Sequence, residues 1–139
     1  MNHDHYPNGY TQELLGNMKT IAVVGASPNE ARPSYGVMQF LIRKGYAITP
    51  VNPGQAGGEI LGQTVIAALG ELNEPVDMID VFRASDAIPA IAEEILALSW
   101  KPKVVWLQLG IRNVAAAAKL EAAGITVIMN RCPAIELNH

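Results

Sequence analysis

Short apolar runs that alternate with longer helical patterns are the feature that most constrains the fold of this chain. The first run, "IAVVGA" at residues 21–26, has no polar alternation, which is typical of a strand covered on both faces. Four further predicted strands lie at residues 46–53, 76–82, 103–110 and 125–130. Apolar residues at helical spacing predict helices over residues 11–18, 34–45, 64–72, 85–99 and 114–124, and a last turn over 132–137.

Strands that alternate with helices in this way favour a parallel sheet with right-handed crossovers. We therefore expect an α/β fold with a single doubly wound, mostly parallel, five-stranded sheet of Rossmann-like type. The 139 residues suit one domain, residues 1–139, in which we expect 1–10 to be flexible. Ser85 or Asp86 should cap the helix over 85–99, and Pro89 is compatible with its first turn.

The composition narrows the classes of function. A net charge of −3, with 17% charged residues, provides no broad positive surface for nucleic acid or an anionic membrane. The single cysteine, Cys132, excludes an internal disulfide and a cysteine-based zinc site. No apolar stretch approaches the ~20 residues of a membrane span, and the polar N-terminus lacks an apolar signal core. We expect a cytoplasmic protein without nucleic-acid or membrane partners.

The loop after the first predicted strand is a candidate phosphate site, because open parallel sheets bind ligands beyond the carboxyl ends of their strands. Gly25 allows a sharp turn, and the helix that follows offers unpaired N–H groups at its start. Ser27 and Ser34 add hydroxyl groups, and Arg32 adds a forked cationic donor. The alternative is that Ser34 only caps the helix and Arg32 is a solvated loop residue. The place of the loop in the fold favours the phosphate site.

The end of the second predicted strand, at Asn52 and Pro53, argues against NAD. Rossmann domains that bind NAD usually carry an acidic residue there to hold the ribose, after a G-x-G-x-x-G turn. Here the next glycine after Gly25 is Gly36. A neutral strand end beside a basic loop is better suited to a nucleotide that carries an extra phosphate.

The other strand ends supply further candidates. Phe82 either faces an adenine or caps the core, and Arg83 follows it at a position from which it could reach a nucleotide phosphate. Gln108 is a polar residue after a wholly apolar run. Near the last strand, Cys132 is either a structural thiol or a redox-active one.

Catalytic groups are scarce in this sequence. The three histidines, His3, His5 and His139, lie in the terminal segments, so the body of the fold has none for general-base catalysis or metal binding. Asp77 and Asp80 lie three apart on a predicted strand, face opposite sides and are not expected to form an acid–base pair. We therefore predict no catalytic residue and no metal site.

The chain resembles the small stand-alone CoA-binding proteins of bacteria and archaea in five segments that occur in the same order: "TIAVVGASPNEARPSYGV", "GYAITPVNP", "VDMIDVFR", "WLQLGI" and "NRCPAIEL". Those proteins are similar to the N-terminal, CoA-binding domain of the succinyl-CoA synthetase alpha subunit. The resemblance extends over about residues 11–137. It implies a Rossmann-like fold that binds coenzyme A with its nucleotide end across the strand termini.

By position, the resemblance implies that Gly25, Ala26 and Ser27 lie along the phosphates of coenzyme A. Arg32 and Tyr35 would border the nucleotide. The synthetase also uses a phosphohistidine of a following domain, which this chain does not match, so ligase activity is not implied.

The resemblance also implies that Asn52 and Pro53 line the other side of the nucleotide, while Phe82 and Arg83 close over its adenine half.

Gln108 and Gly110 would lie toward the pantetheine arm. The sequence departs from the relatives at Asn130, where they usually carry an acidic residue.

Three hypotheses of function follow. The first is a module that binds coenzyme A or an acyl-CoA without catalysis of its own, with a possible mixed disulfide between Cys132 and the CoA thiol. The second is a CoA-handling subunit of an enzyme whose catalytic groups lie in a partner chain. The third is an oxidoreductase that binds a nicotinamide nucleotide.

Overall fold

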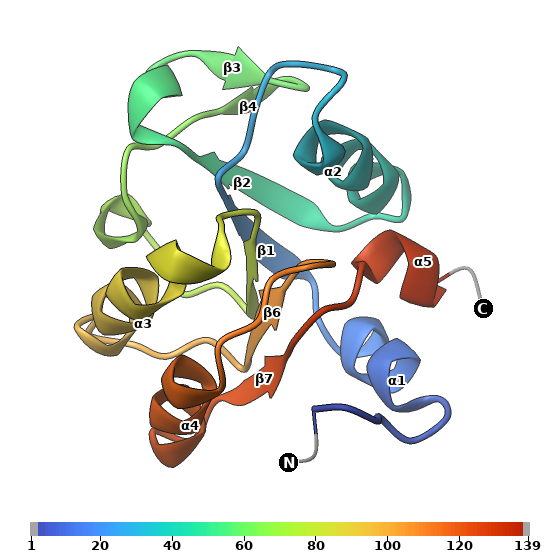
Figure 1. Ribbon diagram of the computed structural model, residues 1–139. Coiled ribbons are helices and arrows are strands. Elements are labelled where there is room, and N and C mark those ends of the chain that lie inside the picture. The colour runs from blue at the N-terminus through green and yellow to red at the C-terminus, as the bar shows by residue number, and fades with distance from the viewer. Residues whose placement is uncertain (1–2, 138–139) are drawn as a thin grey trace.

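The computed structural model describes residues 3–137 and contains a five-stranded parallel sheet with the strand order β2-β1-β5-β6-β7 (Figure 1). The strands are β1 (Thr20–Val24), β2 (Ala47–Val51), β5 (Met78–Val81), β6 (Val104–Leu107) and β7 (Thr126–Ile128). Each neighbouring pair is parallel. The strand order reverses at β1, with β2 on one side of it and β5 on the other, which confirms the doubly wound Rossmann-like fold.

Helices cover both faces of the sheet (Figure 1). One face carries α1 (Tyr10–Gly16), α2 (Pro33–Arg43) and α5 (Pro133–Leu137), and the other carries α3 (Ile88–Leu96) and α4 (Val114–Ala122). Because successive side chains of a strand point to opposite faces, each strand contributes to two apolar layers. In β5, Met78 joins the layer under α1 and α2, while Ile79 joins the layer under α3 and α4.

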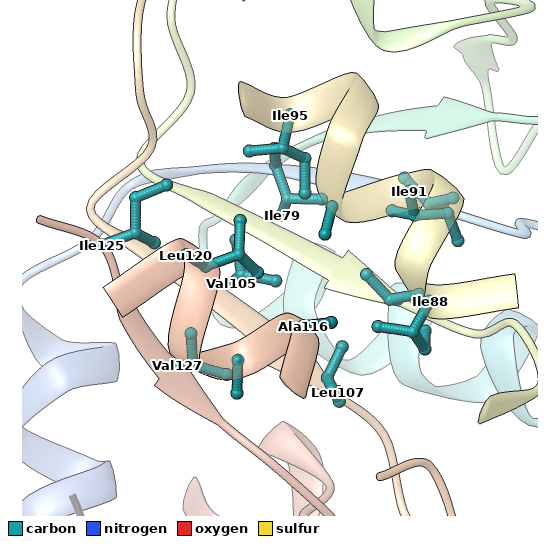
Figure 2. Close-up of a cluster of buried hydrophobic side chains, with 14 of the residues drawn as sticks. Ile79, Ile88, Ile91, Ile95, Val105, Leu107, Ala116, Leu120, Ile125 and Val127 are labelled. Atoms are coloured by element: carbon teal, nitrogen blue, oxygen red, sulfur yellow. The ribbon is translucent and has the colours of Figure 1, made fainter. Parts of the chain in front are cut away.

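The layer under α3 and α4 shows how helical spacing builds this core (Figure 2). Ile88, Ile91 and Ile95 recur along one face of α3 and are buried with Ile79 of β5 and Leu120 of α4. Each such side chain contributes about 1.5–3 kcal/mol when fully buried. This packing holds the sheet rigid and so fixes the positions of the loops at its carboxyl edge.

Residues 57–72 differ from the sequence prediction, which placed a helix over 64–72. The structure has a hairpin of β3 (Glu59–Ile60) and β4 (Gln63–Thr64), followed by an extended segment and the short 3-10 helix η2 (Leu69–Glu71). Ile66 pairs in parallel with Val51, donating its N–H to the carbonyl of Pro50 and accepting from the N–H of Asn52. These sheet-like hydrogen bonds satisfy the backbone and outweigh the helical pattern.

The predicted cap of the helix over 85–99 is also wrong. The 3-10 helix η3 (Ser85–Ala87) precedes α3, and neither Ser85 nor Asp86 caps α3. The Ser85 hydroxyl instead accepts a hydrogen bond from the N–H of Arg112, which ties this loop to the one after β6. Pro89 lies in the first turn of α3, as expected.

Within residues 1–10, for which we predicted flexibility, His3 and Tyr6 pack against the rest of the chain, with Tyr6 at the end of β7. The Tyr6 hydroxyl accepts from the N–H of Met129 and lies 2.7 Å from Nδ1 of His3. Both side chains are buried. Residues 1–2 lie outside the described part of the chain. Within residues 3–137, no helix has the length and apolar character needed to cross a bilayer.

Candidate functional site at the carboxyl edge of the sheet

A cavity of about 860 Å³ opens at the carboxyl ends of β1, β2, β5 and β6. This is the edge at which open α/β sheets bind ligands. Ten of the residues proposed from the sequence line it: Gly25, Ser27, Arg32, Ser34, Asn52, Pro53, Phe82, Arg83, Gln108 and Cys132. Segments that follow five different strands therefore meet around one volume.

The loop after β1 turns sharply at Gly25, whose φ is +84°. A Cβ atom at this position would lie 2.6 Å from the carbonyl oxygen of Phe82 and 3.0 Å from Cδ of Arg83. Only glycine fits this turn, because another residue would be strained at this positive φ and its Cβ atom would clash with the Phe82 carbonyl oxygen. The close approach also places the side chain of Arg83 beside the loop.

The start of α2 faces the cavity through Arg32, Pro33 and Ser34. Arg32 occupies the N-cap position without capping the helix through its side chain, and the first turn contains no acidic residue. Ser34 is also not the cap, in contrast to the alternative considered from the sequence. Pro33 has no N–H, and the N–H of Tyr35 donates to the carbonyl oxygen of Arg32. The attraction for an anion at this end of α2 therefore comes mainly from the positive end of the helix dipole.

Two arginines add positive charge to this end of the cavity. Arg32 and Arg83 are both exposed cavity-lining residues. Within residues 3–137, neither side chain forms a salt bridge or a side-chain hydrogen bond. Their guanidinium groups remain available to a bound anion, to which they could donate in a forked geometry.

Asn52 connects two walls of the cavity through both ends of its side-chain amide. Its Nδ2 donates to the carbonyl oxygen of Ala26 at 2.7 Å, and its Oδ1 accepts from the N–H of Gly54 at 2.9 Å. The residue at the end of β2 thus holds the backbone of both loops. Its side-chain amide carries no negative charge, so it does not replace the acidic residue of an NAD site.

The sequence reasoning missed one wall of the cavity, formed by Ala67, Ala68 and Ile91. Two glutamates pin this wall, because Glu71 accepts from the N–H of Ala68 and Glu94 accepts from the N–H of Leu69. This wall was missed because the sequence pattern predicts a helix over 64–72, whereas an extended segment brings these small residues to the cavity. The pairing of Ile66 with Val51 has no signal in the sequence pattern.

Gln108 lines the cavity at the end of β6 and donates from Nε2 to Oδ1 of Asp80 at 2.7 Å. Both side chains are buried, Asp80 completely. Burial raises the pKa of Asp80 from the ordinary 3.8 to about 7, against the hydrogen bond from Gln108, which lowers it. Asp77, at the other end of the strand, accepts from the N–H groups of Lys19 and Thr20. The two carboxyl groups thus have separate partners.

Cys132 lines the cavity with 9% of its surface exposed and is a free thiol. The loop that carries it is tied to β6, because Nε1 of Trp106 donates to the carbonyl oxygen of Arg131. The adjacent Asn130 adopts a left-handed backbone with a φ of 56° and accepts from the N–H of Gly110. Asparagine tolerates a left-handed backbone, and its Oδ1 can accept this hydrogen bond, so neither feature requires an acidic residue at position 130.

Three of the proposed residues do not line the cavity. Ala26 is buried in the core, although its carbonyl accepts from Asn52. Tyr35 packs against the layer under α2, and Gly110 lies in the exposed turn that Asn130 holds. Their expected contacts with a ligand remain predictions.

Among residues 3–137, Glu94 lines the cavity and neither described histidine does. His3 contacts Tyr6 and Glu121, His5 is exposed, and neither lines the cavity. His139 lies outside the described residues. No cluster of three or more potential metal-ligating His, Cys, Asp or Glu residues occurs in the described part of the chain.

Comparisons with known proteins find the same fold in other small proteins. A Thermus thermophilus protein superposes with a TM-score of 0.89 at 40% identity, covering 96% of this chain and 98% of that one. A Pyrococcus horikoshii protein gives 0.88 at 30% identity, over 97% and 92% of the two chains. The Bacillus subtilis protein YneT is 40% identical over 87% of both chains.

A larger enzyme also shares part of the sequence. The alpha subunit of an ADP-forming acetate–CoA ligase from Pyrococcus furiosus is 35% identical over 86 residues. The match covers 59% of this chain but only 19% of that subunit. A family model described as "CoA binding domain" matches residues 19–138. The chain therefore belongs to the CoA binding domain family.

Proposed function

We propose that this protein binds coenzyme A or an acyl-CoA in the cavity at the carboxyl edge of the sheet, without catalysis of its own. The observation that carries this proposal is the mixed chemistry of one cavity. The start of α2, Arg32 and Arg83 give it positive charge, and Leu109, Ile111 and Cys132 give it apolar surface beside Gln108. Coenzyme A combines a phosphorylated nucleotide with a pantetheine arm and so needs both kinds of lining.

The phosphates would occupy the loop after β1. Gly25 offers a close backbone approach, Ser27 offers a hydroxyl group, and the start of α2 offers the positive end of its dipole. Arg32 and Arg83 would supply the charge that a nucleotide with an additional 3′-phosphate requires.

The adenosine half would lie toward the end of β2, as dinucleotides do in Rossmann folds. Asn52 and Pro53 line that side, and Phe82 supplies an aromatic face. Because Asn52 is neutral and already hydrogen-bonded at both ends of its amide, a ribose diol would find no carboxylate there. This feature favours coenzyme A over NAD.

A second function is favoured by the partial match to a ligase subunit. The chain aligns with a fifth of the alpha subunit of an ADP-forming acetate–CoA ligase. The protein would then present its CoA to a partner chain that carries the catalytic groups. Isolation of the protein with a stoichiometric second chain, which changes the fate of bound acyl-CoA, would support this role.

The proposed function is tested by calorimetric titration of coenzyme A and 3′-dephospho-CoA into the wild-type protein and three variants. Arg32→Ala and Arg83→Ala each remove one cavity arginine, while Arg43→Ala removes an exposed arginine at the far end of α2 as a matched control. We expect coenzyme A to lose about tenfold in affinity with at least one cavity variant, since a charge-assisted hydrogen bond contributes about 1.5–3 kcal/mol. Wild-type affinity in both cavity variants would contradict the proposed phosphate site.

A further inference from the structure

Asp80 is a fully buried carboxyl group that the fold itself does not use. It lies in the centre of β5, paired with Val23 of β1 and Trp106 of β6, on the face covered by α1 and α2. Its Oδ1 accepts from Nε2 of Gln108, and its Oδ2 has no hydrogen-bond partner within residues 3–137. It caps no helix and pairs with no cation in that range.

Such a group is costly, because burial of a carboxyl group disfavours its charged form and raises the pKa of Asp80 to about 7. The one hydrogen bond of its side chain among the described residues is with Gln108, which lines the cavity. We therefore relate the free-energy cost of burying Asp80 to its interaction with the cavity wall rather than to the packing of the sheet.

The contact decides which way the amide of Gln108 faces. Above its pKa, Asp80 is an ionised carboxylate that can only accept hydrogen bonds, so Gln108 must then turn its Nε2 toward it, as the structure has it. Its Oε1 then has no protein partner among the described residues, yet it is not among their buried, unsatisfied polar atoms. Since Gln108 lines the cavity, this oxygen is an acceptor open to the cavity.

We propose that Asp80 is a positioning residue that holds Gln108 with its carbonyl oxygen toward the cavity, where it accepts a hydrogen bond from an amide N–H of the pantetheine arm. This inference rests on the proposed function and names the part of the ligand that the wall after β6 recognises.

The place of Gln108 in the sheet supports this assignment. The phosphate loop follows β1, and the adenosine half of a bound nucleotide extends toward the second strand, here β2. Gln108 follows β6, on the opposite side of β1, where the other arm must extend. Leu109, Ile111 and Cys132 make the wall around it apolar. One fixed acceptor in an apolar wall suits a flexible chain with isolated amide groups.

The test compares the ligand halves in matched variants at pH 8. Asp80→Leu removes the acceptor with little change in size, whereas Asp80→Asn retains an oxygen that can accept from Gln108. Dissociation constants are measured for coenzyme A and for adenosine 3′,5′-bisphosphate, which lacks the pantetheine arm. We expect Asp80→Leu to weaken coenzyme A about tenfold and the bisphosphate less than twofold. Asp80→Asn should bind both ligands like the wild type.

A double-mutant cycle with Gln108→Leu distinguishes positioning from a general loss of structure. Gln108→Leu should show the same selective loss as Asp80→Leu, and the double variant should lose no more than either alone, because both changes remove one interaction. Gln108→Leu alone still tests the selective loss if Asp80→Leu does not fold. Equal weakening of both ligands, or additive losses, would overturn the inference. If the wild type binds the bisphosphate but not coenzyme A, the inference fails while the nucleotide site stands; if it binds neither, the proposed function fails with it.

Discussion

The backbone of Gly25 passes so close to Phe82 that a Cβ atom at Gly25 would lie 2.6 Å from the Phe82 carbonyl oxygen. The contact joins the loops after two neighbouring strands, β1 and β5, and sets the floor of the cavity at the point where the strand order reverses. The geometry of the proposed phosphate site thus depends on a residue without a side chain.

Gly25→Ala should therefore destabilise the protein by about 2 kcal/mol or more, through the positive φ of +84° and the clash with Phe82. Gly36→Ala is the matched control, because a Cβ at Gly36 meets no atom within 4 Å and the residue lies within α2. The control should stabilise by about 0.5–1 kcal/mol. Urea unfolding of both variants measures the difference, and equal effects would contradict this role of Gly25.

Asn52→Asp should destabilise the protein by about 1–2 kcal/mol, because the carboxylate can still accept from Gly54 but cannot donate to Ala26. Asn113→Asp is the control, since Asn113 caps α4 as an acceptor from Ala116 and aspartate performs the same function. Thermal unfolding at pH 7 compares the two. A control variant as unstable as Asn52→Asp would show that the lost donor is not the cause.

Asp80→Asn should make the protein relatively more stable as the pH rises. The folded-state pKa of Asp80 is about 7, above the 3.8 of an exposed carboxyl, so its contribution to stability is fully present below about pH 4 and is lost as the pH rises through 7. Asparagine does not ionise and escapes this loss, which corresponds to about 4 kcal/mol. Denaturant unfolding at pH 5 and pH 8 measures about 3 kcal/mol of this loss, because the remainder has already occurred by pH 5. A difference between variant and wild type that is the same at both pH values would contradict the raised pKa.

Cys132 should form a mixed disulfide with coenzyme A if the pantetheine arm extends along the cavity wall to it. In the reaction with CoA disulfide, the Cys132 thiolate attacks one sulfur, a new S–S bond forms and one CoA leaves as the thiolate. Intact mass spectrometry should find one adduct in the wild type and none in Cys132→Ser. The low exposure of the thiol predicts slower reaction with a reagent that does not fit the cavity. A wild type without the adduct would place the arm elsewhere.

The sequence predicts the main sheet well because most residues of its strands are buried and form mainly apolar runs, interrupted only by single polar residues such as Thr49 and Asp80. The ends of these strands then locate the candidate site, since parallel strands bring their carboxyl ends to one edge. The prediction of a helix over 64–72 is wrong because its short apolar run is compatible with a helix or with an extended strand. The pairing of Ile66 with Val51 favours the extended conformation. Non-local contacts of this kind, like the hydrogen bond between Gln108 and Asp80, have no local signature.

The thermal unfolding midpoint of the wild-type protein with coenzyme A, 3′-dephospho-CoA or NAD tests the central claim most directly. A ligand at 100 times its dissociation constant stabilises by about 2.7 kcal/mol, which raises the midpoint of a domain of this size by about 10 °C. We predict a shift of this order with coenzyme A, a smaller one with 3′-dephospho-CoA and none with NAD. A shift with NAD alone, or no shift with coenzyme A, would contradict the account.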